Sequence, residues 1–144
     1  MEFAPITRDG LADDGTTTVR IRSDADIVVA RQQGRLFVLH LGFSLLEATL
    51  VATAISELAR NIVLYAEHGE IVLRPVERDG KSGVLVIAKD EGPGIAEPPP
   101  EAEEPSPRRL GLRGMKRLMD DLEIESGLGR GTTVAVRKWK GSRS

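Results

Sequence analysis

Apolar side chains recur at helical spacing through the middle of the chain. No Gly or Pro interrupts residues 46–67, and a step of 100° per residue gathers the apolar positions of this run onto one stripe. The stripe comprises Val51, Ala54, Ile55, Leu58, Ile62 and Tyr65. This pattern predicts a long amphipathic helix that buries the stripe in the core. Glu57 and Asn61, four residues apart, border the stripe as neighbours, either on a solvated edge or as the polar roof of a pocket.

Shorter patterns on either side predict the other elements. Alternation of β-branched or apolar residues with polar ones indicates strands, at residues 16–22, 70–76, 83–89, 123–126 and 132–139. Helical spacing indicates two further helices, at residues 26–41 and 110–122. The first would bury Ile27, Ala30, Leu36 and Leu39, and the second Leu112, Met115, Leu118, Met119 and Leu122. Asp79-Gly80 predicts a tight hairpin turn between two of the strands.

These elements predict a single domain of the α+β class. The strand at residues 83–89 is apolar almost throughout, which indicates a central position in the sheet. We expect a two-layer sandwich, in which helices pack on one face of a mixed, mostly antiparallel sheet. The domain would span residues 16–140, between a flexible arm at residues 1–15 and a disordered tail at residues 141–144.

Composition and charge narrow the class of partner. The net charge is −2, with 20 basic and 22 acidic residues, so no overall field favours nucleic acid or an anionic membrane. The absence of Cys excludes disulfides, thiol chemistry and thiolate metal sites. His40 and His68 lack the spacing of a metal-binding pair. No apolar run approaches the length of a membrane span and no signal-peptide pattern is present, so we expect a cytoplasmic protein that binds neither nucleic acid nor membrane.

Two glycine motifs follow the long helix. Asp90-x-Gly92-x-Gly94 comes directly after the apolar strand, where a carboxylate can accept hydrogen bonds from an exocyclic amine; an ordinary turn is the alternative. Gly111-x-x-Gly114 opens the last predicted helix. N–H groups at a helix N-terminus bind phosphate, although a loose helix start would have the same sequence.

Basic residues cluster at this predicted helix start, and a third glycine motif follows further along the chain. Five cations lie within ten residues: Arg108, Arg109, Arg113, Lys116 and Arg117. They form either a local anion-binding patch or a solvated helix face paired with nearby glutamates. The segment Gly129-Arg-Gly131-Thr132-Thr133 predicts a tight turn into the last strand, with hydroxyls that suit a base or a phosphate.

Taken in order, these motifs resemble the GHKL (Bergerat-type) ATP-binding domain and, within it, the anti-sigma-factor serine-protein kinase branch, closest to the RsbT-type switch kinases of the stressosome. The resemblance spans residues 19–139 and rests on DIVVARQQG, TAISELARNIVLYAEHGEI, AKDEGPGI, GLRGMKRLMDDLEIES and GRGTTVAVRKW. It implies the Bergerat fold, binding of ATP or ADP with Mg²⁺, and transfer of the γ-phosphate to a Ser or Thr of a STAS-domain partner in a partner-switching pathway. That partner would be an anti-anti-sigma factor or a stressosome scaffold, with a PP2C-type phosphatase or a sigma factor as a further partner.

The resemblance also implies roles for individual residues. Glu57 would be the general base that takes the proton of the substrate hydroxyl, Asn61 a ligand of Mg²⁺, and Asp90 the carboxylate that recognises adenine. Nucleotide binding would be completed by Gly92, Gly94, Ile95, Arg109, Gly111, Leu112, Gly114, Met115, Thr132 and Thr133. Transfer by such a site would rest mostly on positioning and charge neutralisation.

The predicted ATP lid, residues 96–110, departs from the family pattern. Residues 96–107 hold five prolines and four glutamates, and Arg109 stands where the family usually has glycine. Either an arginine of the lid replaces backbone N–H groups on the phosphate, or the lid does not close. The second outcome would leave a degenerate module that binds nucleotide weakly or not at all and sequesters a sigma factor, a STAS protein or a phosphatase. A detached histidine-kinase catalytic domain is a third hypothesis, which the lack of a histidine-bearing helix pair disfavours.

Overall fold

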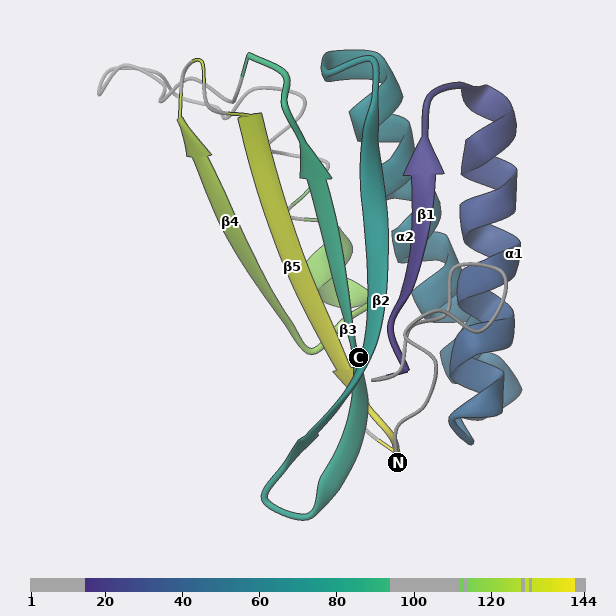
Figure 1. The fold of residues 1–144 in the computed structure, drawn as a ribbon. Coiled ribbons are helices and arrows are strands. Elements are labelled where there is room, and N and C mark those ends of the chain that lie inside the picture. The colour runs from purple at the N-terminus through teal and green to yellow at the C-terminus, as the bar shows by residue number, and fades with distance from the viewer. Residues whose placement is uncertain (1–14, 94–111, 113, 128, 130, 142–144) are drawn as a thin grey trace.

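The computed structural model describes residues 15–93, 112, 114–127, 129 and 131–141 (Figure 1). Of the predicted arm only Gly15 lies within these residues, and of the predicted tail only Gly141. The whole predicted lid lies outside them, so the two lid alternatives concern residues that are not described.

Five strands form one sheet: β1 (Thr17–Ile21), β2 (Gly69–Arg78), β3 (Lys81–Asp90), β4 (Asp121–Gly127) and β5 (Gly131–Trp139). They lie in the order β1-β2-β3-β5-β4, and every neighbouring pair is antiparallel. The apolar strand β3 is therefore central, as predicted, and the parallel part of the expected mixed sheet does not occur among the described strands. Asp79 and Gly80 both have positive φ in the β2–β3 turn, which confirms that hairpin.

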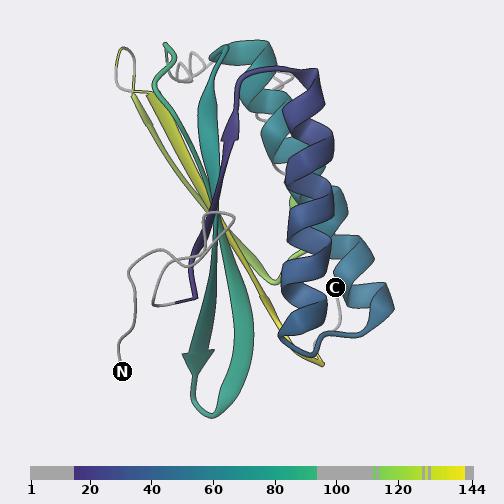
Figure 2. The same ribbon diagram turned by 45° about the vertical axis from the view of Figure 1, so that its right-hand side comes forward.

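Helices α1 (Asp24–His40) and α2 (Leu45–Tyr65) form the second layer, on one face of the sheet (Figure 2). This arrangement confirms the predicted two-layer α+β sandwich. None of the described helices is both long and apolar enough to cross a membrane. The predicted stripe of α2 is buried at Val51, Ala54, Ile55, Leu58 and Ile62. Tyr65, the last residue of α2, is 39% exposed, so the stripe is not buried at this end.

The packing of α1 differs from its predicted face. Leu36, predicted to be buried, is 67% exposed, whereas Val38 is fully buried. The cause is a close helix crossing at Gly34, where a Cβ would overlap Ile55 Cδ1 of α2. This crossing turns the side of α1 that carries Gly34 and Val38 toward α2 and leaves Leu36 in solvent. The other predicted positions are buried or partly buried: Ile27, Ala30 and Leu39.

The prediction of a last helix at residues 110–122 is wrong over the C-terminal part of that range. A short 3-10 helix, η1 (Met115–Arg117), is followed by β4 from Asp121. Pairing with β5 overrides the helical pattern, because the Asp120 N–H donates to the Arg137 carbonyl at 2.8 Å and the Arg137 guanidinium binds Asp121 at 2.9 Å. The apolar side chains predicted for this helix still contribute to the core: Leu112, Met115 and Met119 are buried, and Leu118 and Leu122 partly so.

Glu47 ties the N-terminus of α2 to the segment after β5. The Ser44 N–H donates to Glu47 Oε1 at 3.0 Å and the Glu47 N–H donates to Ser44 Oγ at 3.1 Å, which forms a capping box. The Gly141 N–H donates to Glu47 Oε2 at 2.6 Å, and the buried Lys138 adds a favourable charge interaction. Burial by itself raises the pKa of Glu47, but the hydrogen bonds from Ser44 and Gly141 and the charge of Lys138 outweigh it and lower the pKa.

Substitution of Glu47 tests this contact. Glu47→Ala leaves Lys138 and the Gly141 N–H without the carboxylate, and we expect the free energy of unfolding to fall by about 3 kcal/mol. Glu47→Gln keeps the size of the side chain and removes its charge. Because the pKa of Glu47 is lower in the folded state, its charge stabilises the fold above the unfolded value of about 4.3, and this stabilisation is lost as the pH falls through the folded value.

Urea unfolding at neutral pH and at about pH 3 measures both effects. The stability difference between the wild type and Glu47→Gln should be largest at neutral pH and should shrink in acid. The same pH dependence in both proteins would contradict the lowered pKa.

Candidate functional site

Glu57 and Asn61 lie in the C-terminal half of α2, and both are half-buried at the border of the stripe. Arg60 Nη1 donates to Glu57 Oε2 at 2.9 Å, which forms an ion pair across one turn of the helix. The Asn61 side chain makes no hydrogen bond to the part of the chain that the structure describes. Its amide oxygen is therefore not taken up by any described residue.

Asp90 is a buried carboxylate at the last position of β3. Its Oδ1 accepts the Gly92 N–H at 3.0 Å and the Thr132 N–H at 3.2 Å. Thr132 is also buried, and its hydroxyl lies 3.0 Å from the Ser126 hydroxyl of β4. Backbone N–H groups thus hold the Asp90 carboxylate in place. Asp90, Thr132 and Ser126 form one cross-strand row on the sheet.

Glycines allow the strands and α2 to meet closely around Asp90. Gly69 of β2 pairs with Asp90, and a Cβ there would overlap the Lys89 carbonyl and lie 3.0 Å from Ile62 Cγ2. A Cβ at Gly92 would lie 2.6 Å from Ala66 Cβ, just after the end of α2. The last turns of α2, which follow Asn61, therefore pack against the end of β3. This packing brings the C-terminal end of the helix that carries Glu57 and Asn61 next to the strand end that carries Asp90.

The two threonines of the last glycine motif point to opposite faces of the sheet. Thr132 pairs with Asp90 and with Ser126, and shares their row on the face covered by the helices. Thr133 pairs with Lys89 and Glu125, and so lies on the open face. The structure therefore groups Thr132 with the Asp90 carboxylate and separates Thr133 from it.

The remaining predicted residues divide into three groups. Leu112 and Met115 are buried core side chains, so that any contact with a ligand falls to their backbone groups. Gly114 is exposed and has open space around it. Four predicted residues lie outside the described part of the chain: Gly94, Ile95, Arg109 and Gly111.

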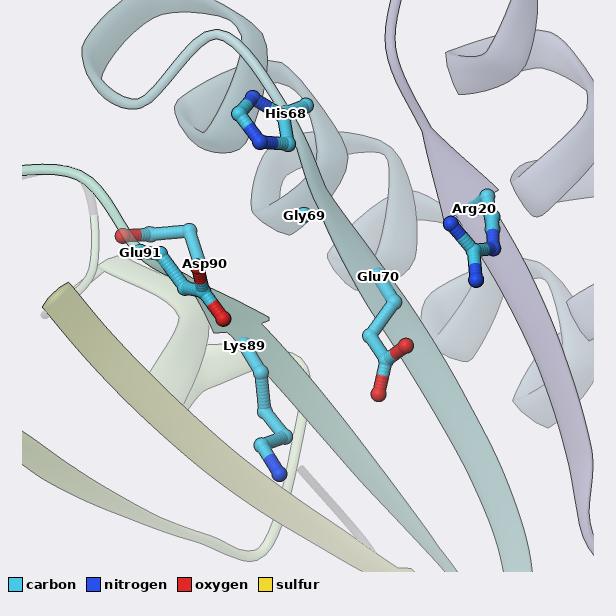
Figure 3. A pocket seen from close by; sticks show the side chains of 7 residues that line it. All are labelled: Arg20, His68, Gly69, Glu70, Lys89, Asp90 and Glu91. Carbon is cyan, nitrogen blue, oxygen red and sulfur yellow. The ribbon is translucent and has the colours of Figure 1, made fainter.

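A pocket of about 310 Å³ opens at the same end of the sheet (Figure 3). It is lined by Arg20, His68, Gly69, Glu70, Lys89, Asp90 and Glu91. Arg20, Glu70 and Lys89 are cross-strand neighbours on the face of the sheet that the helices leave open. This pocket is consequently distinct from the junction of α2 and β3, although Asp90 borders both.

Sequence reasoning missed three residues of the site. Arg60 stands between Glu57 and Asn61, and the helical i,i+3 spacing alone could have indicated its ion pair with Glu57. For Gly69 and Ser126 the sequence contains no local pattern that indicates a place in the site. Their relation to Asp90 and Thr132 depends on strand register, which the sequence leaves open.

The chain is similar to known proteins over most of its length. The family described as histidine kinase-like ATPase domain matches residues 13–138. The serine/threonine-protein kinase RsbT of Bacillus subtilis (strain 168) is 44% identical over 125 residues, covering 84% of this chain and 94% of that kinase. An anti-sigma F factor of Caldanaerobacter subterraneus is 32% identical over 122 residues, covering 78% of this chain and 84% of that protein.

A solved structure with a similar fold contains the RsbU and RsbW domains of a Mycobacterium tuberculosis protein. It matches with a TM-score of 0.59 at 22% sequence identity and covers 92% of this chain. This chain spans 34% of that longer one. At this identity the likeness concerns the fold alone.

Two glycines before β5 give a matched test of the close approach at Asp90. Gly129 and Gly131 have φ of 77° and 79°, so alanine is strained at both. A Cβ at Gly131 would also overlap the Asp90 carbonyl, whereas Gly129 has open space. We expect Gly129→Ala to lower the free energy of unfolding by about 1 kcal/mol and Gly131→Ala by about 3 kcal/mol. Equal losses in urea unfolding would show that the approach to Asp90 is unimportant.

Proposed function

This chain belongs to the histidine kinase-like ATPase domain family, and we propose that it is an ATP-dependent serine/threonine-protein kinase of a partner-switching pathway. The observation that carries the proposal is the junction of α2 and β3. There the end of β3, which carries the buried, backbone-fixed carboxylate of Asp90, packs against the last turns of the helix that carries Glu57 and Asn61. The extent of the identity with the kinase RsbT supports the same activity.

Asp90 is the proposed adenine-binding group. Because the N–H groups of Gly92 and Thr132 hold its carboxylate in place, the acceptor is already oriented before a ligand arrives. A carboxylate accepts a hydrogen bond from the exocyclic amine of adenine and repels the carbonyl oxygen that hypoxanthine has at that position. The neighbouring Thr132 hydroxyl offers a second polar group on the same face of the sheet.

Asn61 is the proposed protein ligand of Mg²⁺. An amide oxygen is a hard ligand, and Mg²⁺ is commonly held by few protein groups together with substrate phosphates. Among the residues that the structure describes, no group of three or more His, Cys, Asp or Glu could hold a metal ion by itself. The half-buried amide of Asn61, which bonds to no described residue, fits this mode of binding. When bound, Mg²⁺ would neutralise charge on the phosphates.

Glu57 is the proposed general base. In the transfer, the serine Oγ bonds to the γ-phosphorus, its proton passes to the Glu57 carboxylate, and the bond from phosphorus to the bridging oxygen breaks to release ADP. The Glu57 side chain is 47% exposed. A serine on the surface of another protein can therefore reach it.

We place the phosphoacceptor in a STAS-domain regulatory protein, either an anti-anti-sigma factor or a stressosome scaffold. The motif resemblance supports this class of substrate, and the anti-sigma F factors among the relatives support a role in partner switching. A PP2C-type phosphatase or a sigma factor is the proposed further partner. The degenerate module without nucleotide is not favoured, because Glu57, Asn61 and Asp90 are all present in a chain this similar to a kinase.

Glu57 variants test the phosphotransfer. We expect Glu57→Gln and Glu57→Ala to slow transfer from labelled MgATP to a STAS-domain partner by about 100-fold or more, since the base is lost. The shift of the melting temperature by MgATP should remain, which shows that binding survives. Unchanged transfer in both variants would rule out Glu57 as the base. No transfer by the wild type would rule out the kinase assignment for that partner.

Asp90 variants test the recognition of adenine. We expect the wild type to bind ATP about 10- to 100-fold more tightly than inosine triphosphate, and Asp90→Asn to lose most of this preference. Calorimetric titration with both nucleotides measures the preference directly. Thr133→Ala is the matched control, because Thr133 lies on the open face and its loss should leave the preference intact. A preference that persists in Asp90→Asn would contradict the assignment.

A further inference from the structure

The proposed base is held by a neighbouring cation. Arg60 Nη1 lies 2.9 Å from Glu57 Oε2, and the two side chains are 50% and 47% exposed. One carboxylate oxygen of Glu57 is thus engaged, and the other, Oε1, has no hydrogen-bond partner among the described residues and can meet a substrate hydroxyl. The ion pair through one oxygen favours orientations in which the second oxygen points away from Arg60, and a general base must have such an oxygen within hydrogen-bond reach of the proton it takes.

Arg60 also has hydrogen-bonding capacity beyond this pair. A guanidinium group has five N–H donors in a rigid plane, and the described structure assigns one of them to Glu57. Arginine of this geometry binds phosphate oxygens well, because two parallel N–H groups match two oxygens. The remaining edge of the group is therefore chemically suited to a phosphoryl group.

Arg60 lies beside Glu57 on the surface of α2, one turn further along the helix. At 100° per residue, Glu57, Arg60 and Asn61 all lie within one 100° sector of the helix surface. Glu57 and Asn61 are half-buried at the border of the stripe, and Arg60 is exposed next to them. Glu57 lies between Arg60 and Asn61 in this sector, so a phosphate held beside Glu57 lies within reach of the long Arg60 side chain.

We propose that Arg60 is a further catalytic residue of this site: it orients the Glu57 carboxylate with one N–H and binds the γ-phosphoryl group of ATP with the others. The inference rests on the proposed kinase function. When serine Oγ attacks phosphorus and its proton moves to Glu57, the phosphoryl oxygens gain charge as the bond to ADP breaks. A guanidinium bridging base and phosphate stabilises that charge and keeps the two reacting groups at a fixed separation.

The first test compares ATP with ADP. Because Arg60 is proposed to contact the γ-phosphate, Arg60→Ala should weaken ATP binding about tenfold and leave ADP binding unchanged. Arg60→Lys should retain part of the ATP preference, since an ammonium group keeps the charge. Arg35→Ala is the matched control. Arg35 is an exposed arginine of α1 that bonds to Thr49 at the other end of α2, about 12 Å from Glu57 along the helix.

The second test is a double-mutant cycle on transfer to a STAS-domain partner at saturating MgATP. We expect kcat to fall about 100-fold in Arg60→Ala and less in Arg60→Lys. In a Glu57→Gln background the further loss from Arg60→Ala should be smaller, because its orienting role is already gone. A melting temperature within a few degrees of the wild type establishes that each variant is folded.

The outcomes separate this inference from the kinase proposal. If the wild type transfers phosphate and Arg60→Ala matches Arg35→Ala in kcat and in the ATP-to-ADP affinity ratio, then Arg60 forms a surface ion pair only and the inference is overturned. An equal weakening of ATP and ADP would overturn the γ-phosphate contact. If the wild type binds ATP but transfers nothing, a selective loss of ATP affinity in Arg60→Ala still supports that contact, while the kinase proposal fails.

Discussion

The close packing of α2 against the sheet is the constraint on which the candidate site depends. Its buried stripe fixes the rotation of the helix, and the rotation decides that Glu57 and Asn61 emerge at the border of the core. The glycines at the end of the sheet then set how near the helix comes. With side chains at Gly69 and Gly92, the last turns of α2 would be pushed away from Asp90.

The site thereby combines two kinds of group with different surroundings. Asp90 is buried and held by backbone N–H groups, so its position follows from the sheet itself. Glu57 and Arg60 are half exposed, and their arrangement depends on each other and on whatever binds there. Under the proposed function, the rigid end would bind the base, and the adaptable end would face the phosphates and the protein substrate.

Much of the fold followed from periodicity, because the long stripe of α2 and the apolar strand β3 are strong local patterns. The failures arose where tertiary contacts decide the outcome. Leu36 faces solvent because of the helix crossing at Gly34, and the helix expected through Leu122 gives way to β4 because β5 offers it a partner. Within the candidate site, motif order predicted functional roles for Glu57, Asn61 and Asp90. Separating Thr132 from Thr133 required the strand register, which no local pattern encodes.

The contact between Glu47 and Gly141 has a consequence for synthesis of the protein on the ribosome. The two residues are 94 positions apart, so the N-terminal end of α2 gains this anchor only after nearly all of the described chain has been made. β5, which aligns Asp90 with Thr132, is also among the last segments to emerge. A nascent chain therefore has α1, α2 and the β2–β3 hairpin well before it has a complete nucleotide site. Under the proposed function, phosphotransfer would therefore require a chain whose translation has passed β5.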